Sequence, residues 1–253
     1  MTFRQKLAER IALTGSNLCV GLDVRAADAS PATRDWIFQV IEETAPHAAA
    51  FKPNSAYFEA LGWQGMRLLE DIVNAIPRDI PIVLDVKRGD IGETQAYYAK
   101  ACFDHLGVDA VTLNPFMGRD TLEPFLAHSG KGLYLLAVTS NAGAADIELQ
   151  HLAGGSRQVF ELVAEMTQAS DQVGLVVGLT NAASDTLAKI PDVPLLIPGL
   201  GAQGGDLGAL RSSQRLAPQL INVSRGILYS EPERSFGDKA ADWKAQIASI
   251  LHA

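Results

Sequence analysis

The chain has 253 residues, of which 47% are hydrophobic and 20% are charged, as in an ordinary globular protein. Its formal net charge of −8 and pI near 5.1 argue against a nucleic-acid partner or an anionic membrane surface. The negative net charge does not exclude an anionic small ligand, because the local charge of a pocket can be positive. No apolar run approaches the roughly 18 residues of a membrane span, and the amphipathic first 16 residues lack the apolar centre of a signal peptide.

Cysteine and histidine usage limits the expected cofactors. The two cysteines, Cys19 and Cys102, both fall within predicted structural elements, so we expect no disulfide framework and a reducing, cytoplasmic setting. The five histidines lack the spacing of a ligand pair, and no CxxC occurs. We therefore expect neither a metal nor another cofactor.

Eight short runs rich in Val, Ile and Leu recur along the chain, and each is a predicted strand. They span residues 18–24, 48–54, 80–87, 110–116, 132–140, 174–180, 193–200 and 219–225. Their near-continuous apolar character favours parallel strands that are covered on both faces.

Segments with helical periodicity lie before, between and after these runs. They span residues 1–16, 33–45, 55–76, 92–107, 119–129, 156–171 and 234–252. Eight strands alternating with helices in about 250 residues match a (β/α)8 TIM barrel, which we expect to form one domain over residues 1–253. An open doubly wound sheet is the rival, but no GxGxxG follows the first strand.

Charged side chains are predicted at the ends of three strands. Asp23, Lys52, and the pair Asp85 and Lys87 end the first three runs. Side chains two residues apart share a strand face, so Asp85 and Lys87 should point together into the barrel, while Leu84 and Val86 face the helices. A lone pair of this kind is usually a solvated strand end, but charges converging from three strands favour a substrate site.

Two further segments are candidates for anion binding. The run PGLGAQGGD (198–206) is rich in glycine, and glycine lets backbone N–H groups approach an anion closely. The run NVSRG (222–226) adds the guanidinium of Arg225. Loops after the seventh and eighth strands commonly bind phosphate in TIM barrels.

These residues resemble the orotidine 5′-phosphate decarboxylase family, in its longer bacterial branch. DVKRGD (85–90) matches the family motif D-x-K-x-x-D. The resemblance extends over nearly the whole chain through the motifs GLDV (21–24), FKPNSAYFE (51–59), TSN (139–141), PGLGAQGGD (198–206) and SRG (224–226).

The resemblance implies a cofactor-independent decarboxylation of orotidine 5′-phosphate to uridine 5′-phosphate, the last step of de novo UMP synthesis. Lys87 would protonate C6, and Asp85 would lie against the substrate carboxylate. Lys52 and Asp23 would hold the ribose hydroxyls and complete the charge network.

The resemblance also implies contacts to the rest of the nucleotide and a homodimer. Asp90 and Thr94 would cross the dimer interface and complete the neighbouring site. The remaining contacts would come from Ser140 at the pyrimidine amide, Pro198 beside the ring, Gln203 and Arg225 at the 5′-phosphate, and the backbone N–H of Ser224. Residues 142–156 vary within the family and receive no chemical role.

Two other functions remain open from the sequence. One is a Mg²⁺-dependent sugar-phosphate lyase of the same suprafamily, because Asp23 and Asp85 could hold the ion if Lys52 and Lys87 did not already neutralise them. The other is a barrel that binds nucleotides without catalysis. The presence of every acid and base of the motif argues against the second.

Overall fold

The predicted barrel is present in the computed structural model, which describes residues 1–182, 184–199, 208–211 and 215–251. Its strands pair in parallel in the order β2-β1-β8-β7-β6-β5-β4-β3. Parallel bridges from Phe51 to Ile82 and from Asn54 to Asp85 bring β3 back to β2. The strands are β1 (Leu18–Leu22), β2 (Ala50–Pro53), β3 (Val83–Arg88), β4 (Ala110–Leu113), β5 (Gly132–Val138), β6 (Val173–Val177), β7 (Leu195–Ile197) and β8 (Gln219–Val223).

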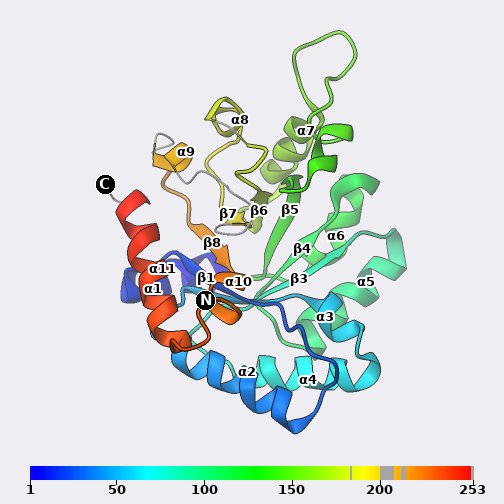
Figure 1. Ribbon diagram of the computed structural model, residues 1–253. Helices are drawn as coiled ribbons and strands as arrows, with labels where there is room; N and C mark the ends of the chain where they lie inside the picture. The colour runs from blue at the N-terminus through cyan, green and yellow to red at the C-terminus, as the bar shows by residue number, and fades with distance from the viewer. Residues whose placement is uncertain (183, 200–207, 212–214, 252–253) are drawn as a thin grey trace.

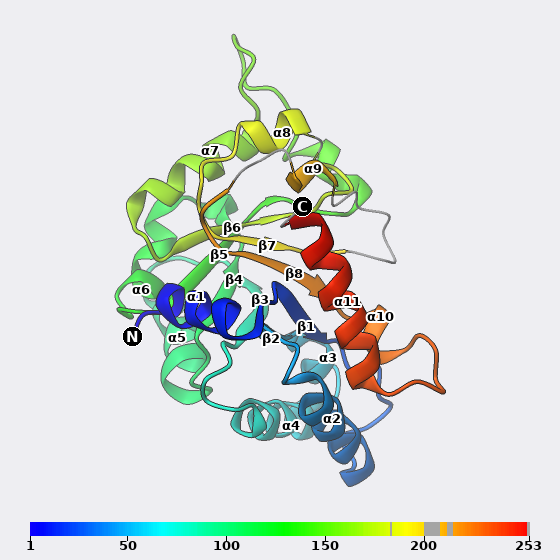
Figure 2. The same ribbon diagram turned by 90° about the vertical axis from the view of Figure 1, so that its left-hand side faces the viewer.

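Helices surround the sheet, and α1 crosses one end of it (Figures 1 and 2). The α-helices are α1 (Phe3–Thr14), α2 (Pro31–Thr44), α3 (Ser55–Glu59), α4 (Gly62–Ala75), α5 (Gly92–Lys100), α6 (Glu123–Leu126), α7 (Val159–Met166), α8 (Ser184–Ala188), α9 (Gly208–Arg211), α10 (Arg225–Leu228) and α11 (Phe236–Leu251). The π and 3-10 turns are η1 (Ala101–His105), η2 (Pro115–Met117), η3 (Arg119–Leu122), η4 (Ala142–Asp146) and η5 (Thr167–Ala169). Among these described residues, no helix has the length and apolarity needed to cross a membrane.

The expectation of one continuous helix over residues 55–76 is wrong. The chain forms α3 and α4 instead, and α4 begins at Gly62, whose φ is 67°. This left-handed conformation turns the chain, and it favours glycine because a Cβ atom would be strained there. The spacing of apolar residues does not reveal this break, since the apolar residues on both sides still face the core.

Every strand contributes a side chain to one apolar cluster inside the barrel. The cluster contains Cys19, Ala50, Val83, Ala110, Tyr134, Val176, Leu196 and Leu220. Phe3 and Leu7 of α1 pack against the same cluster, and the Phe3 ring lies edge-on to Tyr134 at 5.9 Å. The amino-terminal end of the barrel is therefore packed with apolar side chains, which leaves the opposite end for polar residues.

The second core lies between the sheet and its helices. Leu84 and Val86 of β3 belong to this outer cluster, as strand alternation predicts. Asp85, between them, is buried toward the barrel interior. Burial on both faces explains why the strand sequences are almost continuously apolar.

Candidate active site

Three charged side chains meet at the carboxyl end of the barrel, as expected from the sequence. The Nζ atom of Lys52 donates to Oδ2 of Asp85 at 3.0 Å, and the Nζ atom of Lys87 pairs with Oδ1 of the same carboxylate. Lys52 and Asp85 are buried, whereas 47% of the Lys87 side chain is exposed. Asp85 therefore links a buried ammonium group to one that is open at the barrel mouth.

The backbone of β3 is irregular where it carries Lys87. The register of β3 against β4 shifts between Leu84 and Arg88, and Lys87 has a φ of 48°. A non-glycine residue in the left-handed region is uncommon, and such conformations cluster at functional sites. Lys87 thus reaches Asp85 through a bulge and not through the regular alternation that the sequence suggested.

Thr112 of β4 stabilises this bulge, and the sequence analysis missed it. Its hydroxyl accepts hydrogen bonds from the backbone N–H groups of Val86 and Lys87, both at 3.0 Å. The same hydroxyl donates to Oδ1 of Asp85 at 2.9 Å. The available signal was a single polar side chain in an otherwise apolar strand, two residues after the inward-facing Ala110.

The electrostatics of the site favour charged forms of its buried members. Burial alone would raise the pKa of Asp85, but the ammonium groups of Lys52 and Lys87 outweigh burial and hold that pKa well below its usual range. Burial alone would lower the pKa of Lys52, but the carboxylates of Asp85 and Asp23 raise it above its usual range. The pair is therefore ionised at neutral pH.

Asp23 lies just beyond the end of β1 and close enough to Lys52 to affect its pKa. Its Oδ1 atom is buried and has no hydrogen-bond partner among the described residues. A buried carboxylate oxygen without a donor is costly, so this atom is available for a hydroxyl or N–H group of a ligand. Cys19 of β1 is fully buried, and burial raises the pKa of its thiol to about 12. The thiol is therefore protonated and unreactive at neutral pH.

Asp90 and Thr94 are outside this network. Asp90 follows β3 and accepts a hydrogen bond from the N–H of Ile91 at 2.8 Å, while Thr94 is exposed on α5. Within the part of the chain that the structure describes, neither side chain pairs with Lys52, Asp85 or Lys87. The structure of one chain therefore does not bring these two predicted site residues to the charged cluster.

The segment that carries Ser140 is held from two sides. Glu148 accepts hydrogen bonds from the N–H of Thr139 at 2.7 Å and from its hydroxyl at 2.8 Å. The Nδ2 atom of Asn181 donates to the carbonyl groups of Thr139 and Asn141 at 2.7 and 2.8 Å. Ser140 thus sits on a braced turn just after β5, at the same end of the barrel as Asp85.

Of the predicted phosphate ligands, Arg225 and Ser224 lie together after β8. Ser224 is buried, and its Oγ atom has no hydrogen-bond partner among the described residues. Arg225 is exposed and begins α10, so its strand ends two residues earlier than the sequence suggested. Pro198 follows β7, and Gln203 is outside the described residues.

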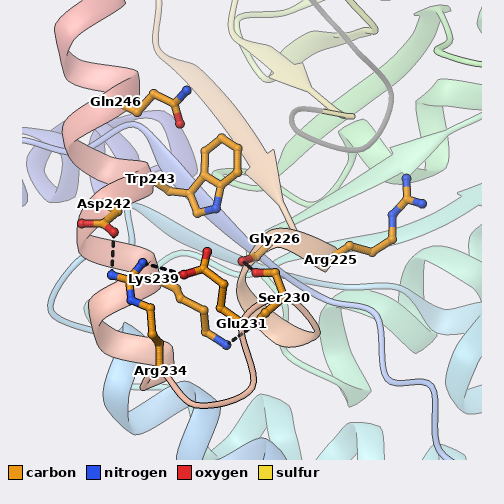
Figure 3. Close-up of a pocket in the computed structure, with 9 residues that line it drawn as sticks. All are labelled: Arg225, Gly226, Ser230, Glu231, Arg234, Lys239, Asp242, Trp243 and Gln246. Atoms are coloured by element: carbon orange, nitrogen blue, oxygen red, sulfur yellow. Dashed lines mark hydrogen bonds and ion pairs between the residues drawn. The ribbon is translucent and has the colours of Figure 1, made fainter.

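Figure 3 shows a surface pocket of about 440 Å³ that Arg225 and Gly226 help to line. Within this pocket Arg234 contacts Glu231 at 3.1 Å and Asp242 at 2.6 Å, and Lys239 donates to the carbonyl of Ser230 at 3.0 Å. The side chain of Arg225 points away from them. A Cβ atom on Gly226 would lie 2.8 Å from Nε1 of Trp243, so a glycine is needed for α10 to pack against α11.

The fold and the site together define a TIM-barrel enzyme class with an Asp–Lys network at the carboxyl end of the strands and a basic group after β8. A family model described as "Orotidine 5′-phosphate decarboxylase / HUMPS family" matches residues 16–239. The chain belongs to this family.

Individual relatives agree over nearly the full length. The orotidine 5′-phosphate decarboxylase of Herpetosiphon aurantiacus is 40% identical over 250 residues, which cover 94% of this chain and 93% of the relative. That of Variovorax paradoxus is 42% identical over 261 residues, covering 95% and 94%. The solved structure of Leishmania donovani OMP decarboxylase is 38% identical, with a TM-score of 0.90 and full coverage of both chains.

Proposed function

We infer that this chain is a carbon–carbon lyase that decarboxylates orotidine 5′-phosphate to uridine 5′-phosphate and CO₂ in UMP synthesis. Family membership and the full-length similarity to named decarboxylases support this activity. The single observation that carries the chemistry is the pair of ion pairs that Asp85 makes with Lys52 and Lys87 at the mouth of the barrel.

Lys87 is the proton donor of the proposed mechanism. Loss of CO₂ from C6 leaves a carbanion that the ring does not delocalise, so a fixed positive charge beside C6 lowers the barrier. The partly exposed ammonium group of Lys87 provides that charge and then the proton. Asp85 holds Lys87 in place and lies against the substrate carboxylate, and buried Lys52 keeps Asp85 ionised.

The other predicted residues bind the nucleotide. Asp23 and Lys52 contact the ribose hydroxyls, and Ser140 contacts the pyrimidine amide edge. Pro198 packs beside the ring, while the 5′-phosphate is held by Gln203, the Ser224 N–H and Arg225. The unpartnered Oδ1 atom of Asp23 and the exposed guanidinium of Arg225 support these two assignments.

We propose a homodimer in which Asp90 and Thr94 complete the partner's site. Four large apolar side chains are exposed on the segments that follow β3 and β4. They are Ile91 (58% exposed), Tyr97 (65%), Phe116 (79%) and Met117 (46%). Exposed apolar surface of this kind marks protein interfaces. Asp90 is next to the first of these residues and has no role in its own charged cluster.

We also propose that residues 1–253 form one domain in the cytoplasm. The outer core runs from Leu18 to Ile247 without interruption between units, which supports a single folding unit. Cys19 and Cys102 are both buried free thiols, in keeping with a reducing compartment.

The test is an absorbance assay of orotidine 5′-phosphate decarboxylation with Lys87→Ala. Without the proton donor, kcat should fall by at least about 10³-fold, and EDTA should leave the wild-type rate unchanged. Lys244→Ala on α11 is the matched control, because it removes an ammonium group outside the network. Undiminished turnover by Lys87→Ala would refute the mechanism, and loss of activity in EDTA would favour a metal-dependent lyase.

A further inference from the structure

Tyr229 connects two parts of the candidate site that are far apart in sequence. It follows α10, which begins at Arg225, and its N–H donates to the Arg225 carbonyl at 3.1 Å. Its hydroxyl reaches the segment after β1, where it donates to the carbonyl of Asp23 at 2.9 Å and accepts from the N–H of Arg25 at 2.7 Å. One phenol group thus uses both its donor and its acceptor on the backbone around Asp23.

The Tyr229 ring is itself held in place by aromatic and cationic neighbours. Trp36 of α2 stacks on it with the ring centroids 5.9 Å apart and an interplanar angle of 26°. Phe236 lies edge-on to Trp36 at 5.8 Å, and the Arg25 guanidinium lies 5.2 Å above the Tyr229 ring. Such packing leaves the hydroxyl little freedom to move.

Asp23 depends on this backbone contact more than its neighbours in the site do. Asp85 is oriented by three side-chain hydrogen bonds. The Asp23 Oδ1 atom has no partner among the described residues, so the direction of that carboxylate follows from the backbone at residues 23–25. Tyr229 binds this backbone on both sides of Val24.

We propose that Tyr229 is a positioning residue that aims the Asp23 carboxylate at a sugar hydroxyl of the substrate and couples this contact to the helix of Arg225. The inference rests on the proposed function, in which Asp23 binds the ribose and Arg225 binds the phosphate. Tyr229 itself touches neither the substrate nor the reacting atoms. Its effect on catalysis passes through Asp23.

The experiment is a double-mutant cycle on kcat/KM for orotidine 5′-phosphate with Tyr229→Phe and Asp23→Ala. Phenylalanine keeps the ring stack and removes only the two hydroxyl hydrogen bonds. Tyr229→Phe should lower kcat/KM about tenfold in the wild-type background, the effect of one misplaced hydrogen bond. In the Asp23→Ala background the same change should cost less than about twofold, because the carboxylate that it positions is absent.

Tyr98→Phe is the matched control, since Arg88 lies 5.0 Å above the Tyr98 ring in a similar stack, and this variant should keep full activity. If Asp23→Ala is poorly folded, Asp23→Asn replaces it in the cycle. If Tyr229→Phe lowers kcat/KM equally in both backgrounds, or in neither, the inference about Tyr229 is overturned and the proposed function still stands. Wild-type activity of Asp23→Ala would instead remove Asp23 from the proposed site, and the inference with it.

Discussion

Asp85 is the residue on which the candidate site is built. It accepts hydrogen bonds from Lys52, Lys87 and Thr112, which lie on three neighbouring strands. A buried carboxylate with three donors is oriented without any contribution from the substrate. The proposed chemistry therefore starts from a network that the fold has already arranged.

The depressed pKa of Asp85 predicts a specific pH dependence of stability. Its folded-state pKa is below that of the unfolded chain, so its stabilising contribution is full above about pH 4 and is lost as the pH falls through the folded-state value. The raised pKa of Lys52 acts in the opposite direction, because its contribution is full below about pH 10 and is lost only at higher pH. The network should therefore be insensitive to pH between these limits.

Urea unfolding of the wild type and Asp85→Asn at about pH 3.5, 5 and 7 tests this expectation. The difference in the free energy of unfolding should be equal at the two higher pH values and smaller at the lowest. Asp171→Asn is the control, since Asp171 belongs to no ion pair among the described residues. A difference that does not change at the lowest pH would show that Asp85 is not paired as described.

At the scale of elements, the carboxyl ends of the strands are stabilised by segments that carry no predicted chemistry. Residues 142–156 had no assigned role, yet Glu148 within them binds both the N–H and the hydroxyl of Thr139. Asn181 after β6 binds the same turn from the other side. The loop after β5 itself and the loop after β6 thus fix the position of Ser140, in keeping with site loops on a rigid barrel.

Glu148→Ala should therefore raise the KM for orotidine 5′-phosphate about fivefold through loss of the Thr139 hydrogen bonds, and kcat should change less than KM. Glu148→Gln keeps one acceptor and should have a smaller effect. Glu165→Ala, which removes a carboxylate from an exposed pair with Arg157, should leave both constants unchanged. A wild-type KM in Glu148→Ala would contradict the prediction, because it would show that these hydrogen bonds do not affect substrate binding through Ser140.

At the scale of the whole molecule, the charged cluster and the proposed partner residues lie on one end of the barrel. The apolar cluster inside the barrel and α1 close the other end. The exposed apolar side chains near Asp90 provide surface for the proposed second copy. A dimer that buries this surface would bring the carboxyl ends of the two barrels toward each other.

Hybrid dimers test the shared site. Lys87→Ala and Asp90→Ala should each be nearly inactive alone, because each lacks one component of every site. A mixture that is unfolded and refolded together should regain activity, since one of the two sites in a hybrid dimer carries both native residues. Each variant refolded alone is the control. No recovery, with dimers present by analytical ultracentrifugation, would contradict an active site shared between subunits.

Much of the barrel was predictable from local pattern. All eight strands occur at the expected places because parallel strands buried on both faces leave a run of apolar residues that needs no alternation to be recognised. The ends were less accurate, since Asp23, Ser140 and Arg225 follow their strands instead of ending them. The break at Gly62 was also missed, because apolar spacing does not report a left-handed residue.

The sequence by itself determined the order of the eight strands and of the longer helices, the inward direction of Asp85, and the set of acids and bases that the family motif requires. Those features depend on spacing along one element or on residue identity. Only the tertiary structure decided that Thr112 supports the Lys87 bulge, that Glu148 holds the Ser140 turn, and that Tyr229 binds the backbone of Asp23. The contacts of Thr112 and Tyr229 join different strand–helix units, so they exist only after the barrel has formed. Glu148 and Thr139 lie in the same loop after β5, and their contact depends on the path of that loop, which apolar spacing does not report.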